Sequence, residues 1–517
     1  MKQFHFTLII VLLMSVTNNV AAYDFEVDGI YYTMLSFEDL TCEVAPYYSD
    51  RSNYSGDITI PEKVSYNGKT LSVTRIGNKA FYYQDTSTGT KLTSVKIPNS
   101  ITSIGTNAFV RAVGLKAIII PTSVTKIEFG AFQVCHGLTS IDIPKSVESL
   151  GNSVFYNCIN LASVQLSSQL QRIEPYTFYN CQSLSSIDIP NNVTSIGKSA
   201  FAECASLTSI KIPNRVIEIE GPEVSRGYNT LSDRGFLHFD SDKGAFENCT
   251  QLTTIELNNG IERIGNKAFA GCFNLRELII PGSTVELGFD SFRDCPITRL
   301  IINPNKSTPI IISYNYSGEG RYYNSVYVYD MFTKCPIKEL WLGRRAIRQK
   351  DVIDDCFFLE MTDKKGLFGN QIESITFHDN ISEEDVELLS LKGLPLSRLS
   401  FGKGFSVIPD LKDNELDSLI IHNEVPPIAT GFSNKTFMNC RLYVPEGSKE
   451  KYQSANVWKN FWNIIELTPS VLGVESAKSD NIVAEHYGLD GRKLLEPNRG
   501  INIIKMSDGT VRKVMIK

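Results

Sequence analysis

Phenylalanine returns at a fixed interval through the first half of the chain. Phe109, Phe132 and Phe155 lie 23 residues apart, and after an insertion the same interval resumes. The recurring residues are Phe109, Phe132, Phe155, Phe178, Phe201, Phe246, Phe269 and Phe292. A fixed interval of this length indicates structural repeats that stack, each in contact only with its neighbours. The sequence therefore predicts a repeat solenoid, a fold suited to presenting a long surface to a partner.

Each repeat supplies the parts of a short coil. In the repeat at residues 138–158, Ile141 and Ile143 alternate with a polar residue, which predicts a β-strand with both isoleucines inward; Pro144 ends it. Gly151 predicts a sharp turn before a short helical or irregular segment that carries the phenylalanine. One unit buries too little apolar surface to offset its ordering. We therefore expect successive strands to pair as a parallel sheet on one side of the stack.

A cysteine stands three places after seven of the phenylalanines. The seven are Cys135, Cys158, Cys181, Cys204, Cys249, Cys272 and Cys295. Equivalent residues of a solenoid form a column, and this column lies between phenylalanines and leucines, a setting for a small buried hydrophobe. The total of 11 cysteines is odd, and no C-x-x-C pair is present to hold zinc. We expect unpaired buried thiols, with no metal and no cofactor.

The first 22 residues have the features of a secretory signal peptide. Lys2 precedes an apolar run at residues 6–14, and small residues at 20–22 place cleavage before Tyr23. The run is shorter than the ~20 residues that a bilayer span needs, and no comparable run follows. We expect export to the cell surface or beyond it, without a transmembrane anchor. The net charge of −6, with interspersed signs, argues against nucleic acid as a partner.

The repeat carries a recognisable consensus. Between residues 75 and 463 the pattern L-x-x-I-x-I-P-x-x-V-x-x-I-G-x-x-A-F-x-x-C recurs, cleanly as far as Cys295. It resembles the Treponema-type leucine-rich repeats of BspA-like surface proteins of Bacteroidetes. Residues 23–71 look like the N-terminal piece of that family, and their Asp28-Gly29 and Asn67-Gly68 pairs predict hairpin turns. The resemblance implies a leucine-rich repeat solenoid with its parallel sheet on the concave side, and adhesion to host proteins or other microbes.

Five segments are expected along the chain. They are a signal peptide at 1–22, an N-terminal β cap at 23–74, the leucine-rich repeat solenoid at 75–466, a linker at 467–480 and a small C-terminal β segment at 481–517. The solenoid should close in a terminal cap at 442–466, sealed by Tyr452, Trp458, Phe461 and Trp462. The C-terminal segment, with an Asp508-Gly509 turn, resembles the sorting domains of Bacteroidetes secreted proteins. A small β tail without a targeting role is the alternative.

Two insertions interrupt the repeat, near residues 220–243 and 303–330. The first is polar, so it should project as a loop; a tolerated surface insertion is the bland alternative. The second predicts a hairpin with one tyrosine-rich face suited to sugars or protein surfaces, unless its rings cap irregular coils instead. Its tyrosines are Tyr314, Tyr316, Tyr322, Tyr323, Tyr327 and Tyr329.

The outward strand positions near the second insertion are unusually apolar. Ile279, Ile301 and Trp341 occupy such positions, whereas most equivalent positions in earlier repeats are polar or charged. The residues expected beside them are Glu277, Arg299 and Glu339. We predict that these six residues and the six tyrosines form a ligand-binding patch. In the alternative, the insertion folds over the three apolar side chains and hides them.

Catalysis has no support in the sequence. The six histidines form no recognisable constellation, and no G-x-S-x-G, H-E-x-x-H or P-loop motif occurs. We expect a secreted or cell-surface protein that is not an enzyme and that mediates protein–protein interaction in adhesion. The alternative is a glycan-binding or envelope-structural protein. The expected partners are extracellular proteins or glycans of a host or of neighbouring microbes.

Overall fold

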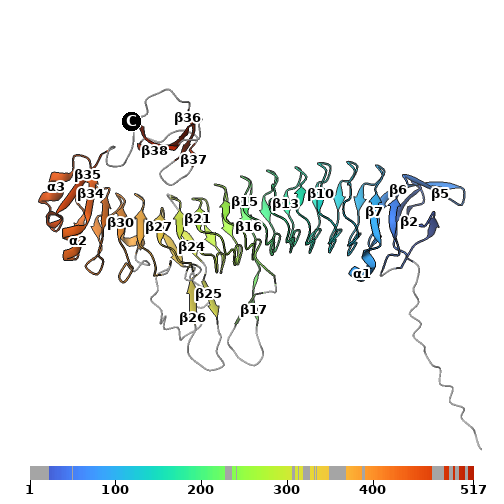
Figure 1. Ribbon diagram of the computed structural model, residues 1–517, viewed down its shortest axis with the longest axis horizontal. Helices are drawn as coiled ribbons and strands as arrows, with labels where there is room; N and C mark the ends of the chain where they lie inside the picture. Colours follow the sequence, from blue (N-terminus) through green and yellow to red (C-terminus); the bar gives the residue numbers. More distant parts are fainter. Residues whose placement is uncertain are drawn as a thin grey trace, which may run out of the picture. The chain divides into compact units, whose positions relative to one another are not determined.

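The computed structural model consists of stacked coils and divides into two compact units, residues 1–158 and 159–517. Figure 1 shows the strands of successive coils side by side within each unit. The structure describes residues 22–48, 51–227, 236–239, 242–305, 309–312, 314–317, 327–330, 332, 335–348, 368, 370–386, 391–468, 483–487, 493–494, 500–506 and 511–516. Of the predicted signal peptide, residues 1–21 lie outside this set. No helix within it is long and apolar enough to cross a membrane.

Unit 1 opens with antiparallel hairpins. Its first strands are β1 (Phe25–Val27), β2 (Ile30–Ser36), β3 (Thr41–Val44), β4 (Gly56–Thr59), β5 (Lys63–Tyr66) and β6 (Lys69–Ile76). β1 pairs with β2, β2 with β3, and β5 with β6. Both predicted turns are present: φ is 53° and 78° at Asp28 and Gly29, and 48° and 73° at Asn67 and Gly68. Positive φ at both central residues matches the turn's twist to that of its strands.

The opening hairpins continue directly into the coils of unit 1. The later elements of the unit are α1 (Thr86–Gly89), β7 (Leu92–Lys96), β8 (Ser103–Ile104), β9 (Lys126–Ile127), β10 (Ser140–Asp142) and β11 (Ser149–Leu150). One sheet has the order β1-β2-β3-β6-β8-β9-β11, and its last four strands are parallel. Ile76, Ile104, Ile127 and Leu150 share one register position in these four strands and are buried. Strand β6 therefore covers what would otherwise be an open edge of the first coil.

Unit 2 contains two long parallel sheets. The first runs β13-β14-β16-β20-β22-β24-β28 and the second β21-β23-β27-β29-β30-β32-β34-β35. The strands of the first sheet are β13 (Arg172–Ile173), β14 (Ser195–Ile196), β16 (Glu218–Ile219), β20 (Arg263–Ile264), β22 (Glu286–Leu287), β24 (Ile310–Ile312) and β28 (Ala346–Arg348). Those of the second are β21 (Glu277–Ile280), β23 (Arg299–Ile302), β27 (Glu339–Leu342), β29 (Ser374–Phe377), β30 (Arg398–Phe401), β32 (Ser418–Ile421), β34 (Arg441–Pro445) and β35 (Asn463–Leu467).

The first sheet corrects the predicted repeat, which had only one strand. Most of its strands are two residues long, as in β14 (Ser195–Ile196). Alternation over two residues is too short to reveal a strand from sequence. The leucine-rich repeat fold class is confirmed, with this second strand added.

The other short elements of unit 2 are β12 (Ser163–Gln165), β15 (Ser209–Lys211), β19 (Thr254–Glu256), β31 (Val407–Ile408), β33 (Ile428–Ala429) and the 3-10 helix η1 (Glu383–Val386).

The recurring phenylalanines stack in a file inside each unit. In unit 1 the rings of Phe81, Phe109, Phe132 and Phe155 follow one another at centroid distances of 4.9, 5.1 and 5.7 Å, within 9° of parallel. In unit 2 the file begins with Phe178 and Phe201, 5.3 Å apart, and continues through Phe246, Phe269, Phe292 and Phe332. All of these side chains are fully buried. The aligned spine predicted from the interval is confirmed within each unit.

Tight turns on both sides of each ring make the coils short. The residues two before and two after the phenylalanine repeatedly adopt positive φ, as at Ser153 (60°) and Asn157 (58°) around Phe155. Asn, Asp and Gly take this conformation most easily. Val134, two residues after Phe132, has φ of 61° and is the β-branched exception. Local strain is therefore expected at Val134.

The repeated glycine has a different cause from the one predicted. Gly151 and Gly197 do not have positive φ, so the turn itself does not require glycine. A Cβ at Gly151 would lie 2.4 Å from the Phe129 nitrogen, and a Cβ at Gly197 would lie 2.6 Å from the Pro175 nitrogen. The requirement is thus for close approach of consecutive coils.

Both insertions contain antiparallel hairpins. The first consists of β17 (Val224–Gly227) and β18 (Phe236–Phe239), and the second of β25 (Tyr314–Ser317) and β26 (Tyr327–Asp330). The C-terminal segment is a four-stranded antiparallel sheet, ordered β37-β36-β38-β39. Its strands are β36 (Val483–Tyr487), β37 (Lys493–Leu494), β38 (Gly500–Met506) and β39 (Val511–Ile516). Its resemblance to a sorting domain stays a prediction.

The terminal cap is built mostly as predicted. It comprises α2 (Asn434–Asn439), β34, α3 (Lys449–Ser454), η2 (Trp458–Asn460) and β35. Tyr452, Trp458 and Phe461 are buried, but Trp462 is 73% exposed, so the prediction that Trp462 seals the cap is wrong. Trp462 lies directly before β35, in which Asn463 is also exposed and Ile464 is the first buried side chain.

Candidate functional site

The predicted patch lies on three neighbouring parallel strands of unit 2. In β21, β23 and β27 the register aligns Ile279 with Ile301 and Trp341. The row beside them aligns Glu277 with Arg299 and Glu339. We call these six residues the Trp341 patch. The insertion before β27 does not shift the pairing, so the predicted juxtaposition is confirmed, while the patch's role in binding stays a prediction.

Charges alternate along one row of the Trp341 patch. The Arg299 guanidinium pairs with the Glu277 carboxylate, and its Nε lies 3.5 Å from Glu339 Oε2. Arg398 in β30 reaches Glu339 as well, with Nη2 3.6 Å from Oε1. These side chains are about half exposed, so each pair contributes little to stability. The row offers a partner a fixed pattern of alternating charge.

The row of apolar side chains in the Trp341 patch is less exposed to solvent than predicted. Ile279 and Trp341 are partly exposed, but Ile301 is only 1% exposed. Ile301 lies between them on the middle strand, and side chains on adjacent strands are close enough to cover it. The expectation that Ile301 faces solvent is therefore wrong. Ile279 and Trp341 are the apolar side chains of the patch that a partner can touch.

A buried arginine fixes the end of β27. Arg344 is 2% exposed, and its guanidinium donates hydrogen bonds to the carbonyl oxygens of Gly282 and Pro281, both at 3.0 Å, and of Thr284. Burial lowers the pKa of Arg344 to about 10, so it remains protonated at neutral pH. The bonds join the turn after β27 to the turn after β21, which holds the strands of the Trp341 patch at a fixed spacing.

Two histidines that were not predicted from the sequence extend this surface. His378 directly follows β29, and its ring lies edge-on to Trp341 at 5.5 Å. His422 directly follows β32, with Nε2 3.2 Å from Ser400 Oγ. Burial lowers the pKa of His422, which keeps its imidazole neutral at pH 7. Both histidines directly follow a strand of the second sheet, and this shared position is the sequence signal by which they could have been found.

The hairpin of the second insertion carries four of the six tyrosines. Tyr314, Tyr316, Tyr327 and Tyr329 lie in the β25–β26 hairpin, a sheet separate from that of β21, β23 and β27. The predicted hairpin is confirmed, and its register aligns Tyr314 with Asp330, Tyr316 with Val328, Tyr329 with Asn315 and Tyr327 with Ser317. The tyrosine-rich face, and the part that these residues play in binding, stay predictions. Tyr322 and Tyr323 lie outside the described residues.

The column cysteines belong to the interior and not to a site. Ten cysteines of the described structure are free and buried; Cys356 lies outside it. Burial raises the pKa of Cys158 and of Cys204 to about 12, so these thiols are neutral. Among the described residues, no group of three or more His, Cys, Asp or Glu side chains could hold a metal ion.

Comparison with known proteins identifies the repeats. The family model of the BspA type leucine-rich repeat region matches the chain in six copies, over residues 65–129, 103–223 and 241–323. No curated protein matches the chain significantly.

Several solved structures are similar in fold. A leucine-rich repeat protein from Bacteroides ovatus is 19% identical, with a TM-score of 0.43, over 86% of this chain and 100% of that one. The pneumococcal vaccine antigen PcpA is also 19% identical, with a TM-score of 0.38, over 86% and 98%. The T. pallidum leucine-rich repeat protein is 24% identical, with a TM-score of 0.30, over 49% and 90%.

Proposed function

Because the repeats of this chain belong to the BspA type of leucine-rich repeat, we propose that it is an exported adhesion protein that binds an extracellular protein of a host or neighbouring microbe through the Trp341 patch. The role is binding and not catalysis. The signal-peptide features of residues 1–22 support export.

One observation carries the proposal: the partly exposed indole of Trp341 lies in register beside an alternating row of charges. Tryptophan and arginine are the side chains that most often dominate the energy of protein interfaces. The charged row would set orientation and discriminate between partners. Arg344 favours a preformed surface, because it fixes the spacing of the coils that carry the patch.

The test is binding of the purified chain to a panel of immobilised extracellular-matrix proteins. Trp341→Ala should weaken capture of the partner about tenfold or more, as expected for a central interface residue. Phe37→Ala is the matched control, since it also removes an exposed aromatic side chain (83%) but lies in unit 1, outside the Trp341 patch. Equal binding by wild type and Trp341→Ala, or equal loss in both variants, would contradict the proposal.

A further inference from the structure

Trp462 is the one large aromatic side chain of the terminal cap that does not help to build it. Trp458 is 1% exposed, and its Nε1 donates a hydrogen bond to the Pro427 carbonyl at 2.6 Å. Tyr452 is buried, and its hydroxyl donates a hydrogen bond to the Asn423 carbonyl at 2.8 Å. Trp462 is instead 73% exposed. An indole left in water at a pocket points to a contact outside the fold.

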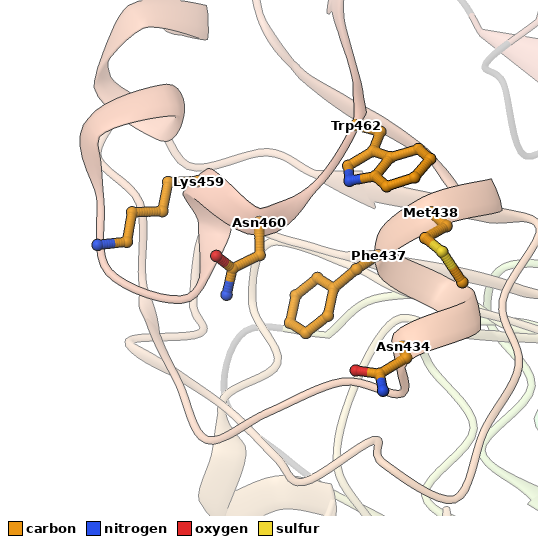
Figure 2. Close-up of a pocket in the computed structure, with 6 residues that line it drawn as sticks. All are labelled: Asn434, Phe437, Met438, Lys459, Asn460 and Trp462. Carbon is orange, nitrogen blue, oxygen red and sulfur yellow. The ribbon is translucent and has the colours of Figure 1, made fainter.

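The pocket beside Trp462 is shallow, and the Phe437 ring forms part of its floor. It has a volume of about 560 Å³, and Figure 2 shows the side chains that line it: Asn434, Phe437, Met438, Lys459, Asn460 and Trp462. The backbone N–H of Trp462 donates to the Phe437 carbonyl at 3.0 Å, which ties the turn before β35 to α2. The Phe437 ring packs edge-on against Phe461 at 5.2 Å. The Trp462 backbone and the Phe437 ring are therefore held in place before any ligand arrives.

Three polar groups face solvent around this aromatic floor. Asn434, Lys459 and Asn460 are exposed, and within the described part of the chain their side chains form no hydrogen bond or ion pair. Figure 2 shows Asn434 and Asn460 on either side of the Phe437 ring, with the nitrogen-bearing edge of Trp462 turned toward the same space. Each amide can donate and accept at once, and the ammonium can only donate.

We propose that this pocket binds a pyranose ring of a glycan, stacked on the Trp462 indole. The C–H face of a sugar ring suits the electron-rich face of an indole. Its hydroxyls donate and accept as the amides do. A purely apolar ligand would leave the amides unpaired on burial, which is costly. A nucleotide could stack too, but among the residues that line the pocket only Lys459 offers its phosphates a cation.

The test is a glycan array probed with the full-length chain. Wild type should bind one or more glycans, and Trp462→Ala should weaken that binding about tenfold or more, through loss of the stacking contact. Asn460→Ala should weaken it to a smaller extent. Phe273→Ala is the matched control, because Phe273 is an exposed aromatic residue of unit 2 (54%) outside the pocket, and this variant should bind as wild type does.

A solution measurement separates ligand binding from loss of fold. Trp462 should be the tryptophan most accessible to acrylamide, and a glycan identified on the array should protect it from quenching, an effect absent in Trp462→Phe. The proposal is overturned if no glycan binds, if Phe273→Ala loses binding equally, or if acrylamide does not reach Trp462 in the full-length chain. It is also overturned if the Trp462-dependent ligand is a protein that still binds after deglycosylation.

Discussion

The Cys249 thiol donates a hydrogen bond to the carbonyl oxygen of Phe201, 3.2 Å away, although 48 residues separate the two. Cys135 makes the same bond to Phe109, and Cys295 to Phe269, each across 26 residues and at 3.1 Å. Each bond joins the cysteine column to the phenylalanine file one coil earlier. The insertion between Phe201 and Cys249 is therefore extruded without interrupting the interior, and the cysteine contributes a buried donor as well as its volume.

Removing the Cys249 donor should destabilise the protein. In Cys249→Ala the Phe201 carbonyl keeps the Cys204 backbone N–H at 3.1 Å but loses its thiol partner, and we expect the free energy of unfolding to fall by about 0.5–1 kcal/mol more than in Cys440→Ala. Cys440 is also buried and free but donates no such bond in the described structure. Urea unfolding of both variants measures the difference. Equal losses would show that the thiol acts only by filling space.

Replacing Val134 with asparagine should stabilise unit 1. Val134 has φ of 61°, a conformation that costs a β-branched residue about 1 kcal/mol or more relative to asparagine. The equivalent residue one coil later is Asn157, with φ of 58°. We expect the urea midpoint of Val134→Asn to rise. Val425→Asn makes the same chemical change at an exposed residue without positive φ and should bring no gain; a gain in both variants would contradict relief of strain.

Reversing the charge of Arg299 should destabilise the Trp341 patch in a salt-dependent way. Arg299→Glu would place three carboxylates in neighbouring register positions, with Glu277 and Glu339 on either side. Like charges directly opposite one another cost about 0.2–1 kcal/mol per pair. Thermal unfolding should show a lower midpoint than that of Arg299→Gln at low salt. The gap should narrow in about 1 M salt, and a gap that salt leaves unchanged would point to packing instead.

Alkaline pH should weaken the fold through its buried thiols. Burial raises the pKa of Cys158 and Cys204 to about 12, against about 8.5 for an exposed thiol. Between these values the unfolded chain releases thiol protons that the folded chain retains, so the free energy of unfolding falls as pH rises, whereas below about pH 8 the thiols add no pH dependence. Above pH 9, the free energy of unfolding of the double variant Cys158→Ala/Cys204→Ala should fall less steeply than that of wild type. Parallel curves would contradict raised thiol pKa values.

The sequence predicted the repeats and the neighbours of Trp341 because both depend on spacing. A period of 23 residues places Phe132 over Phe109, and strand alternation places Ile279 beside Ile301 whatever lies between the strands. Burial was harder to predict. Ile301 is buried at an outward strand position, and Trp462 is exposed beside a buried Phe461; both outcomes depend on three-dimensional detail that no periodicity contains.

The reason for the repeated glycine could not be predicted from the sequence either. A Cβ at Gly151 would clash with the backbone of the preceding coil. The distance between two coils cannot be predicted from the residues of one coil. The second strand of the coil, as in β13 and β14, was missed because alternation over two residues is too short to reveal a strand.

Alkylation mapping tests most directly that stacked coils share a closed interior in each unit. The full-length chain is treated with iodoacetamide at about pH 8, once folded and once in urea without reductant, and each cysteine is located by mass spectrometry. The ten cysteines that the structure finds free and buried should resist modification while the chain is folded, and all should be modified in urea. Rapid labelling of the column cysteines in the folded chain, or labelling that requires a reductant, would contradict this architecture.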